Sequence, residues 1–185
     1  PSGVGFQAFG PTHLLWLLAG LLLCVGACVF YRNLSADRRK IMLTVLGVFI
    51  FLLEVVKDLV LIGLHEFGWE NLPFHLCGIN ILLIAFDTIK QSKVVRSFLY
   101  YFSIPGAALA LLFPNWTEMP VWNFFHIHSE ILHIALVLFP ILLISDGFRP
   151  NFRRLWKIAI AALVLCIPIY IINVTLGTNF FFING

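Results

Sequence analysis

The sequence predicts an all-α protein, a polytopic bundle of transmembrane helices. Of its 185 residues, 61% are hydrophobic and 11% are charged, whereas soluble domains are about 45–50% apolar and about 25% charged. The mean hydropathy is +0.97, and the apolar residues gather in runs that approach or reach the roughly 17–25 residues needed to cross a bilayer. These observations argue against a soluble globular domain.

Six apolar runs each predict one helix. They cover residues 13–31, 41–62, 72–86, 94–113, 124–145 and 155–176. The third run is short, and the fourth contains a helix-breaking Pro105–Gly106 pair. The connectors hold no Gly/Ser-rich linker and no repeat, so we expect a single membrane domain over residues 1–185.

The basic residues predict the orientation of the bundle. Eleven of the twelve Lys and Arg residues lie in or beside the first, third and fifth connectors, and such residues concentrate on the cytoplasmic side. They are Arg32, Arg38, Arg39, Lys40, Lys90, Lys93, Arg96, Arg149, Arg153, Arg154 and Lys157. The N-terminus is therefore expected outside, and a seventh helix is expected beyond Gly185 in a longer chain.

The second and fourth connectors have the opposite character. They hold acidic residues and tryptophans, namely Glu66, Glu70, Glu118, Trp69, Trp116 and Trp122. Tryptophans gather at membrane interfaces, so we interpret these three as an aromatic belt at the outer face. Because the basic residues lie beside apolar spans, membrane lipids are the expected partners and nucleic acid is not.

Three ionisable residues lie inside the second helix, where charge is costly. Glu54, Lys57 and Asp58 are three or four residues apart and so share one helical face. They either form a structural ion cluster that locks the helix to its neighbours or bind a substrate or ion. The sequence leaves both interpretations open.

The fifth helix begins with a segment rich in histidine. His126, Glu130 and His133 fall within about 60° of one another on a helical wheel, while His128 points elsewhere. Such a stripe could hold a metal ion or handle protons.

The third helix carries Cys77 between His75 and Asn80. On a regular helix His75 and Cys77 face about 160° apart, so a base for Cys77 would have to come from another helix. Taken alone, Cys77 is better explained as a small buried hydrophobe, and we interpret Cys24, Cys28 and Cys166 in the same way.

Depth connects these segments. In the predicted orientation, polar side chains from five helices lie at one level near the outer face. They are His13, Glu54, Lys57, Asp58, His75, Cys77, Asn80, His126, Glu130, His133, Asn173, Thr175, Thr178 and Asn179. One shared pocket open to the outer leaflet explains this arrangement.

Residues 72–80 (LPFHLCGIN), the His/Glu-rich fifth helix and the ending NVTLGTNFFFING resemble the YwaF family of bacterial integral membrane proteins. That family is related to the eukaryotic transmembrane protein 164 family, which is associated with phospholipid acyl transfer through a cysteine. The resemblance implies a bacterial cytoplasmic-membrane protein in which the cysteine is Cys77.

Together, the pocket and the resemblance lead to the hypothesis of a cofactor-independent lipid acyltransferase or acyl-processing enzyme. Cys77 would form a thioester, His133 or His126 would be the base, and Glu130 would orient that histidine. The substrate would contact His75, Asn80, Glu54, Lys57, Asp58, Asn173 and Asn179.

Two other hypotheses remain. The first is a heptahelical transporter or receptor-like protein in which the charged residues and histidines bind a solute or relay protons. Its cytoplasmic half would hold few polar groups, which weighs against transport. The second is a zinc-dependent lipid hydrolase that uses His126, Glu130 and His133.

Overall fold

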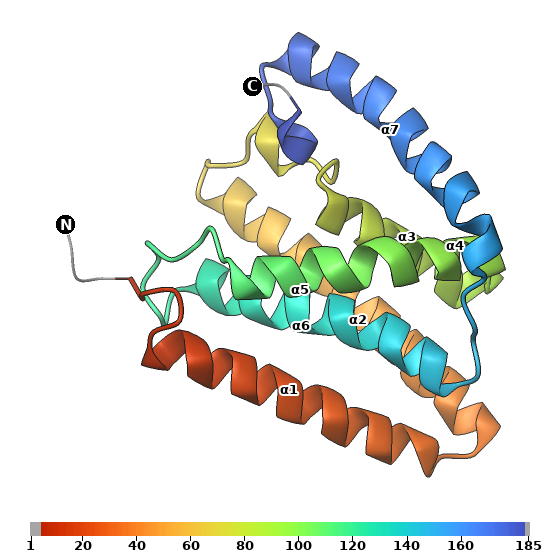
Figure 1. The fold of residues 1–185 in the computed structure, drawn as a ribbon. Helices are drawn as coiled ribbons and strands as arrows, with labels where there is room; N and C mark the ends of the chain where they lie inside the picture. Colours follow the sequence, from red (N-terminus) through yellow and green to blue (C-terminus); the bar gives the residue numbers. More distant parts are fainter. Residues whose placement is uncertain (1–4, 184–185) are drawn as a thin grey trace.

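The computed structural model describes residues 5–183, without the side chain of Arg154. Within this range every regular element is helical, which confirms the all-α prediction. The longer helices are α1 (Pro11–Arg32), α2 (Ala36–Gly63), α3 (Leu76–Lys90), α4 (Lys93–Phe98), α5 (Ile104–Leu112), α6 (Phe124–Ser145) and α7 (Leu155–Leu176) (Figure 1). The short ones are η1 (Trp69–Asn71), η2 (Leu99–Ser103), η3 (Phe152–Arg154) and η4 (Phe180–Phe182).

Helices α4, η2 and α5 together form the predicted fourth helix. The segment η2 is a π-helix that ends two residues before Pro105. Proline has no backbone N–H and therefore cannot bond the carbonyl one turn earlier, and a wider π turn accommodates this. The hydroxyl of Ser103 donates to the Leu136 carbonyl of α6 over 2.9 Å, so the predicted irregularity is present and is anchored to the bundle.

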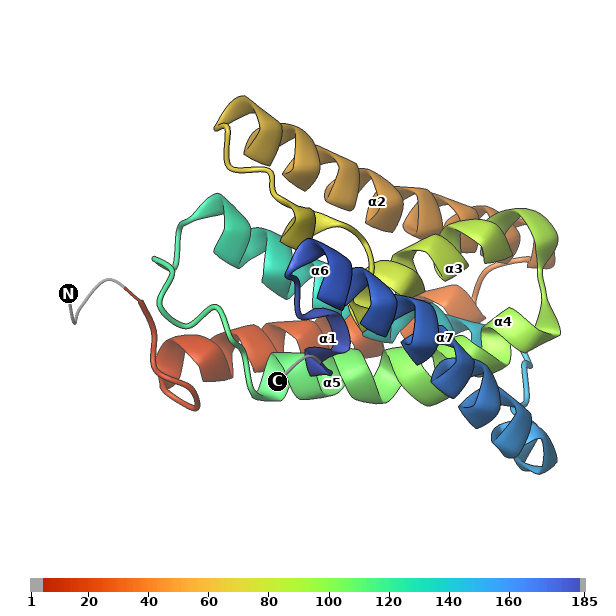
Figure 2. The same ribbon diagram turned by 90° about the horizontal axis from the view of Figure 1, so that it is seen from above.

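Helix α6 lies at the centre of the bundle. It contacts α1, α2, α3 and α5, and Figures 1 and 2 show these helices around it. Leu136, Phe139 and Leu142 of α6 are almost fully buried. A Cβ at Gly47 of α2 would overlap the side chain of Thr88 in α3, so glycine there allows these two helices to pack closely.

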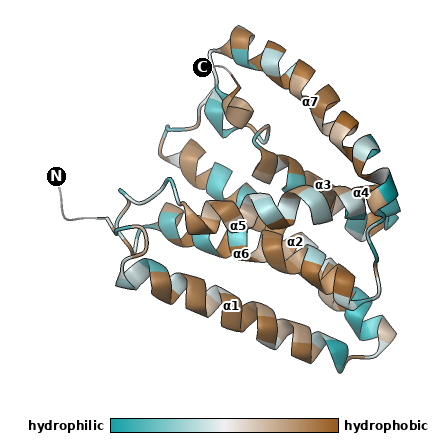
Figure 3. Cartoon of the chain, in the orientation of Figure 1, coloured by the Kyte–Doolittle hydropathy of each residue, from teal (hydrophilic) through white to brown (hydrophobic). Residues whose placement is uncertain are grey.

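Helices α1 and α7 lie at the periphery and are apolar on most of their surface (Figure 3). In the described part of the chain, four helices are long and apolar enough to cross a membrane: α1, the joined segment Lys93–Leu112, α6 and α7. Exposed apolar surface on this scale is suited to lipid rather than water. The structure therefore supports a membrane protein.

The sequence predicted six membrane-spanning helices. Helices α2 and α3 are the two predicted spans that are not both long enough and apolar enough to cross a membrane. Helix α3 has 15 residues, about 22 Å at 1.5 Å per residue, which is shorter than a hydrocarbon core of about 30 Å. Helix α2 has 28 residues but contains Glu54, Lys57 and Asp58 in its apolar part. Both predicted helices are therefore present, but α3 is too short and α2 too charged to count as a membrane span.

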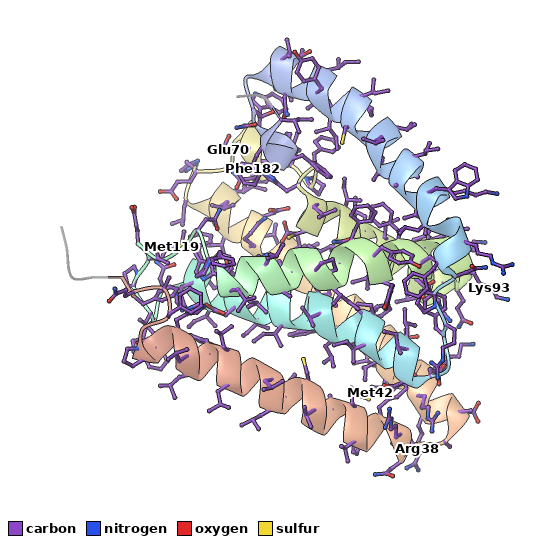
Figure 4. The ribbon with its side chains drawn as sticks, in the orientation of Figure 1. Arg38, Met42, Glu70, Lys93, Met119 and Phe182 are labelled. Atoms are coloured by element: carbon purple, nitrogen blue, oxygen red, sulfur yellow. The ribbon has the colours of Figure 1, made fainter. Side chains whose placement is uncertain are left out.

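The bundle has two chemically different ends. Figure 4 shows Arg38 and Lys93 at one end, which we call the basic end, and Glu70 and Met119 at the opposite end, which we call the pocket end. The orientation of these ends relative to the two faces of the membrane stays a prediction.

Candidate functional site

A cavity of about 190 Å³ opens at the pocket end, between α2, α3, α6 and the η1 segment. Its walls combine charged, polar and apolar side chains. They come from Glu54, Lys57, Glu70, Asn71, Leu72, Pro73, His75, Cys77, Gly78, Ile81, His128, Ser129 and Leu132. Four predicted site residues, Glu54, Lys57, His75 and Cys77, therefore meet in one pocket, together with His128, which was not predicted to belong to the site.

Cys77 lies in the wall of this pocket and contacts a histidine of another helix. The distance from its Sγ atom to Nε2 of His133 is 3.3 Å. The two residues are 56 positions apart in the chain, and α3 and α6 pack directly against each other. Of the two bases that the sequence left open, His133 is the one that contacts the thiol.

The imidazole of His133 is held in one tautomer. Its Nδ1 lies 2.7 Å from the carbonyl oxygen of Ser129, and a carbonyl can only accept a hydrogen bond, so Nδ1 carries the proton. Nε2 then presents its lone pair to the S–H group of Cys77. This is the arrangement that a general base needs beside a nucleophile.

The local sequence explains why Cys77 lies where it does. Helix α3 begins at Leu76, with His75 as its N-cap residue, so Cys77 falls in the first helical turn. A Cβ at Gly78 would lie 2.7 Å from the backbone of Pro73, and glycine therefore lets the preceding loop fold back onto the helix start. Negative charge near a helix N-terminus is stabilised by the helix dipole, which offsets part of the cost of forming a thiolate in this partly buried position.

The charged residues of α2 form a connected cluster beside the thiol. Lys57 forms ion pairs with Glu54 and, over 3.3 Å, with Asp58. The second carboxylate oxygen of Glu54 lies 3.8 Å from Nε2 of His128. The cluster links α2 to α6, as the structural interpretation requires, and it also presents Glu54 and Lys57 to the cavity, as the binding interpretation requires.

The helical wheel predicted that His128 points away from the stripe of His126, Glu130 and His133, and in the structure His128 lines the pocket from another face of α6. The three residues of the stripe contact different neighbours, whereas His128 faces α2 and the cavity. Because α6 is surrounded by other helices, more than one of its faces is functional surface. The ionisable residues of α2 were the signal that could have indicated a partner for His128.

The predicted role of Glu130 is corrected by its contacts. Its Oε1 accepts a hydrogen bond of 3.2 Å from the indole N–H of Trp116, and the histidine is oriented by the Ser129 carbonyl instead. Trp116, assigned to an aromatic belt, is only 6% exposed and stacks on His133. Trp69 and Trp122 are exposed, as a belt requires.

His126 lies on another side of α6 and does not line the pocket. It is fully buried, and its ring contacts Phe6 and Trp16. His126, Glu130 and His133 thus have separate neighbours although they share a stripe. Among the described residues no group of three or more His, Cys, Asp or Glu side chains is placed to hold a metal ion, so the predicted zinc trio is not assembled.

Other predicted polar residues form structural contacts outside the pocket. His13 accepts a bond from the Phe9 N–H at Nδ1 and donates from Nε2 to the Leu111 carbonyl, which joins α1 to α5. Asn80 is buried in α3 away from the cavity wall. One shared pocket was therefore too simple, because the packing of α6 separates its polar neighbours.

Asn173 organises the end of the described chain. It bonds the backbone N–H and the carbonyl of Phe180 and accepts from Thr178. Phe180 packs on the ring of His75 with centroids 5.1 Å apart. Asn173 and Asn179 do not line the pocket, and Asn173 supports the pocket wall only through Phe180.

Comparison with known protein families shows to which family the chain belongs. The TMEM164 family model matches residues 8–185. The chain belongs to the TMEM164 family. No curated protein matches the chain, and no solved structure does. The relation to the transmembrane protein 164 family is thereby confirmed for this TMEM164-family chain, and the bacterial YwaF assignment stays a prediction.

Proposed function

We propose that this TMEM164-family protein is a membrane-embedded lipid acyltransferase that works through a thioester on Cys77. The observation that carries the proposal is the 3.3 Å contact between Sγ of Cys77 and Nε2 of His133 at the wall of a polar pocket. A thiol and a histidine of fixed tautomer form the nucleophile and base of many acyl-transfer sites.

The first half-reaction takes the acyl group from a lipid ester. His133 accepts the thiol proton at Nε2, and the thiolate attacks the ester carbonyl carbon to form a tetrahedral intermediate. When the ester C–O bond breaks, the leaving alkoxide takes the proton from His133 and departs as an alcohol. The acyl group remains on Cys77 as a thioester.

The second half-reaction passes the acyl group to an acceptor. The hydroxyl group of a second lipid or lysolipid gives its proton to His133 and attacks the thioester carbon. The C–S bond breaks, the sulfur takes the proton back, and a new ester is released. No oxidant, reductant or other co-reactant is needed.

The pocket walls suit a lipid at the boundary between head group and chain. Glu54, Lys57 and His75 offer polar contacts, whereas Ile81 and Leu132 are apolar. Sites for small molecules commonly combine a few polar groups with apolar walls. We therefore assign head-group contact to Glu54, Lys57 and His75, and we place the pocket in the outer leaflet of a bacterial membrane.

A second candidate function is binding of a polar solute or of protons by the α2 cluster. The observation that favours it is that Glu54, Lys57 and His128 face the cavity rather than a neighbouring helix alone. In that case Cys77 would be a packing residue, and the pocket would take a solute without any covalent step.

Intact-mass analysis separates these two functions. The purified protein is incubated with phospholipid vesicles, and the acyl adduct is tested for release by hydroxylamine, which cleaves thioesters. We expect an adduct in the natural protein, none in Cys77→Ser, and an undiminished adduct in Cys166→Ser, the matched control on α7. If none of the three proteins forms an adduct, Cys77 is a packing residue and the solute-binding function is favoured.

A further inference from the structure

We propose that Trp116, held in place by Glu130, is a positioning residue that keeps the imidazole of His133 directed at Cys77. This inference rests on the proposed function. It assigns a role to a tryptophan in the connector between α5 and α6, well before the histidine in the chain. It also gives Glu130 a role that acts on His133 through Trp116.

The first argument is the geometry of the stack. The indole of Trp116 and the imidazole of His133 are nearly parallel, with an interplanar angle of 17° and centroids 5.1 Å apart. The Ser129 carbonyl holds the imidazole by one hydrogen bond in the ring plane. That bond alone leaves the ring free to tilt out of plane, and the indole covers one face of the ring and so limits this tilt.

The second argument concerns what fixes the indole itself. An indole has one hydrogen-bond donor, and here its N–H donates to Oε1 of Glu130 over 3.2 Å. Glu130 and His133 are three residues apart on α6, where side chains lie side by side. The two contacts that hold the Trp116 indole, the hydrogen bond to Glu130 and the stack on His133, thus both come from α6. The indole therefore keeps a fixed position relative to the His133 imidazole.

The third argument is burial. Glu130 is 1% exposed and Trp116 is 6% exposed, so the bond between them is protected from competing water. A carboxylic group is costly to bury without a partner. The hydrogen bond to the tryptophan partly offsets that cost, which gives a reason for the acidic residue in an otherwise apolar stretch of α6.

The stack also has an electrostatic effect on the reaction. Positive charge develops on His133 when it takes the thiol proton, and the face of an indole attracts a cation. Loss of the aromatic ring should therefore reduce both the alignment and the basicity that His133 offers to Cys77. A smaller aromatic ring at position 116 should keep part of this effect, whereas an aliphatic side chain should not.

The test measures the reactivity of Cys77 without any lipid substrate. Rates of alkylation by iodoacetamide are followed on the full chain by peptide mapping, with Cys28 as an internal control. We expect Trp116→Leu and His133→Ala each to lower the Cys77 rate about tenfold, and the double variant to show no further loss, because both changes act through one interaction. Trp116→Phe should recover most of the rate.

The pair Glu130→Gln and Glu130→Leu tests the anchor. Glutamine keeps a carbonyl acceptor for the indole N–H and should retain the Cys77 rate, whereas leucine removes the acceptor and should approach the rate of Trp116→Leu. An unchanged Cys28 rate shows that the bundle stays folded.

The outcomes distinguish this inference from the proposed function. An unchanged or raised Cys77 rate in Trp116→Leu, or additive losses in the double variant, would overturn the positioning role even if the natural protein forms the acyl thioester. Conversely, non-additive losses together with no acyl adduct would support the positioning role and overturn the acyltransferase.

Discussion

The basic end and the pocket end both contain charged residues inside the bundle, but these residues are used differently. At the basic end Arg96 donates from Nε to both carboxylate oxygens of Asp87, over 2.9 and 3.2 Å. Arg39 donates to the carbonyls of Leu34 and Arg32 and lies 3.6 Å from Asp146. These groups face one another and do not line the pocket.

At the pocket end some carboxylate and imidazole atoms have no partner among the described residues. Oε2 of Glu130 and both ring nitrogens of His126 are buried without a hydrogen-bond partner in the described chain. Lys57 and Glu54 face a cavity while pairing with each other. Buried polar groups without partners are costly and concentrate at functional sites. The difference teaches that access to a cavity, rather than the number of charges, separates a structural cluster from a candidate site.

The largest effect that would test this comparison is at His133. We expect His133→Ala to lower acyl-adduct formation on Cys77 at least 100-fold, since general-base catalysis contributes about 10²–10⁴-fold. A moderate loss of thermal stability should accompany it, because the variant also loses the bond to Ser129 and the stack on Trp116. Intact mass and thermal unfolding in the same detergent provide the two readouts. A variant that forms the adduct at the natural rate would contradict the base assignment.

The basic end should show the reverse pattern. Arg96→Met leaves the carboxylate of Asp87, 1% exposed, without its partner, and breaking such a pair costs about 3 kcal/mol. We expect this loss in the free energy of unfolding, while the rate of adduct formation per folded molecule stays the same. Arg96→Met combined with Asp87→Asn should recover part of the stability. A selective loss of activity would remove the distinction between the two ends.

The α2 cluster allows a sharper test of structure against binding. Lys57→Met should destabilise the protein by about 2 kcal/mol, since two partly buried carboxylates lose their cation. The triple variant Glu54→Gln, Lys57→Met and Asp58→Asn removes all three charges and should recover most of the stability. If the triple variant is stable but forms no adduct, the cluster binds substrate; if it is stable and active, the cluster is structural.

The smallest expected effect concerns the hydrogen bonds between Asn173 and the backbone of Phe180, at the end of α7. Asn173→Ala removes the side chain that bonds the backbone of Phe180, and we expect a loss of about 1 kcal/mol. Limited proteolysis should show faster cleavage near residues 177–182. Adduct formation should fall less than threefold, because Asn173 touches the pocket only through Phe180. A large loss of activity would place this segment in the site itself.

Much of the fold follows from local properties of the sequence. Hydropathy alone located the helices, because a helix that contacts lipid must be apolar over most of its length. The basic residues and Pro105 likewise indicated the basic end and the irregular fourth helix. Each of these features depends on one segment and on the solvent around it. They can therefore be predicted from the sequence without knowledge of the tertiary structure.

The composition of the candidate site was only partly predictable. Ionisable residues stand out in apolar helices, so His133 and Lys57 were identified by type alone, whereas Cys77 was identified by the family resemblance. Trp116 was misassigned because an exposed tryptophan of an aromatic belt and a buried one that stacks on an imidazole have the same local sequence signal. The bonds of Asn173 to Phe180 were not predicted, because Phe180 lies in an irregular segment that periodicity does not describe.

The sequence by itself determined that this protein is helical, suited to a membrane and supplied with a few reactive side chains. Only the tertiary structure decided that His133 rather than His126 meets Cys77 and that His128 faces the pocket. Helical periodicity relates residues on one helix, whereas the rotation of α6 against α2 and α3 is set by side-chain packing over its whole length. A site between helices depends on that rotation, which cannot be predicted from the sequence of any one helix.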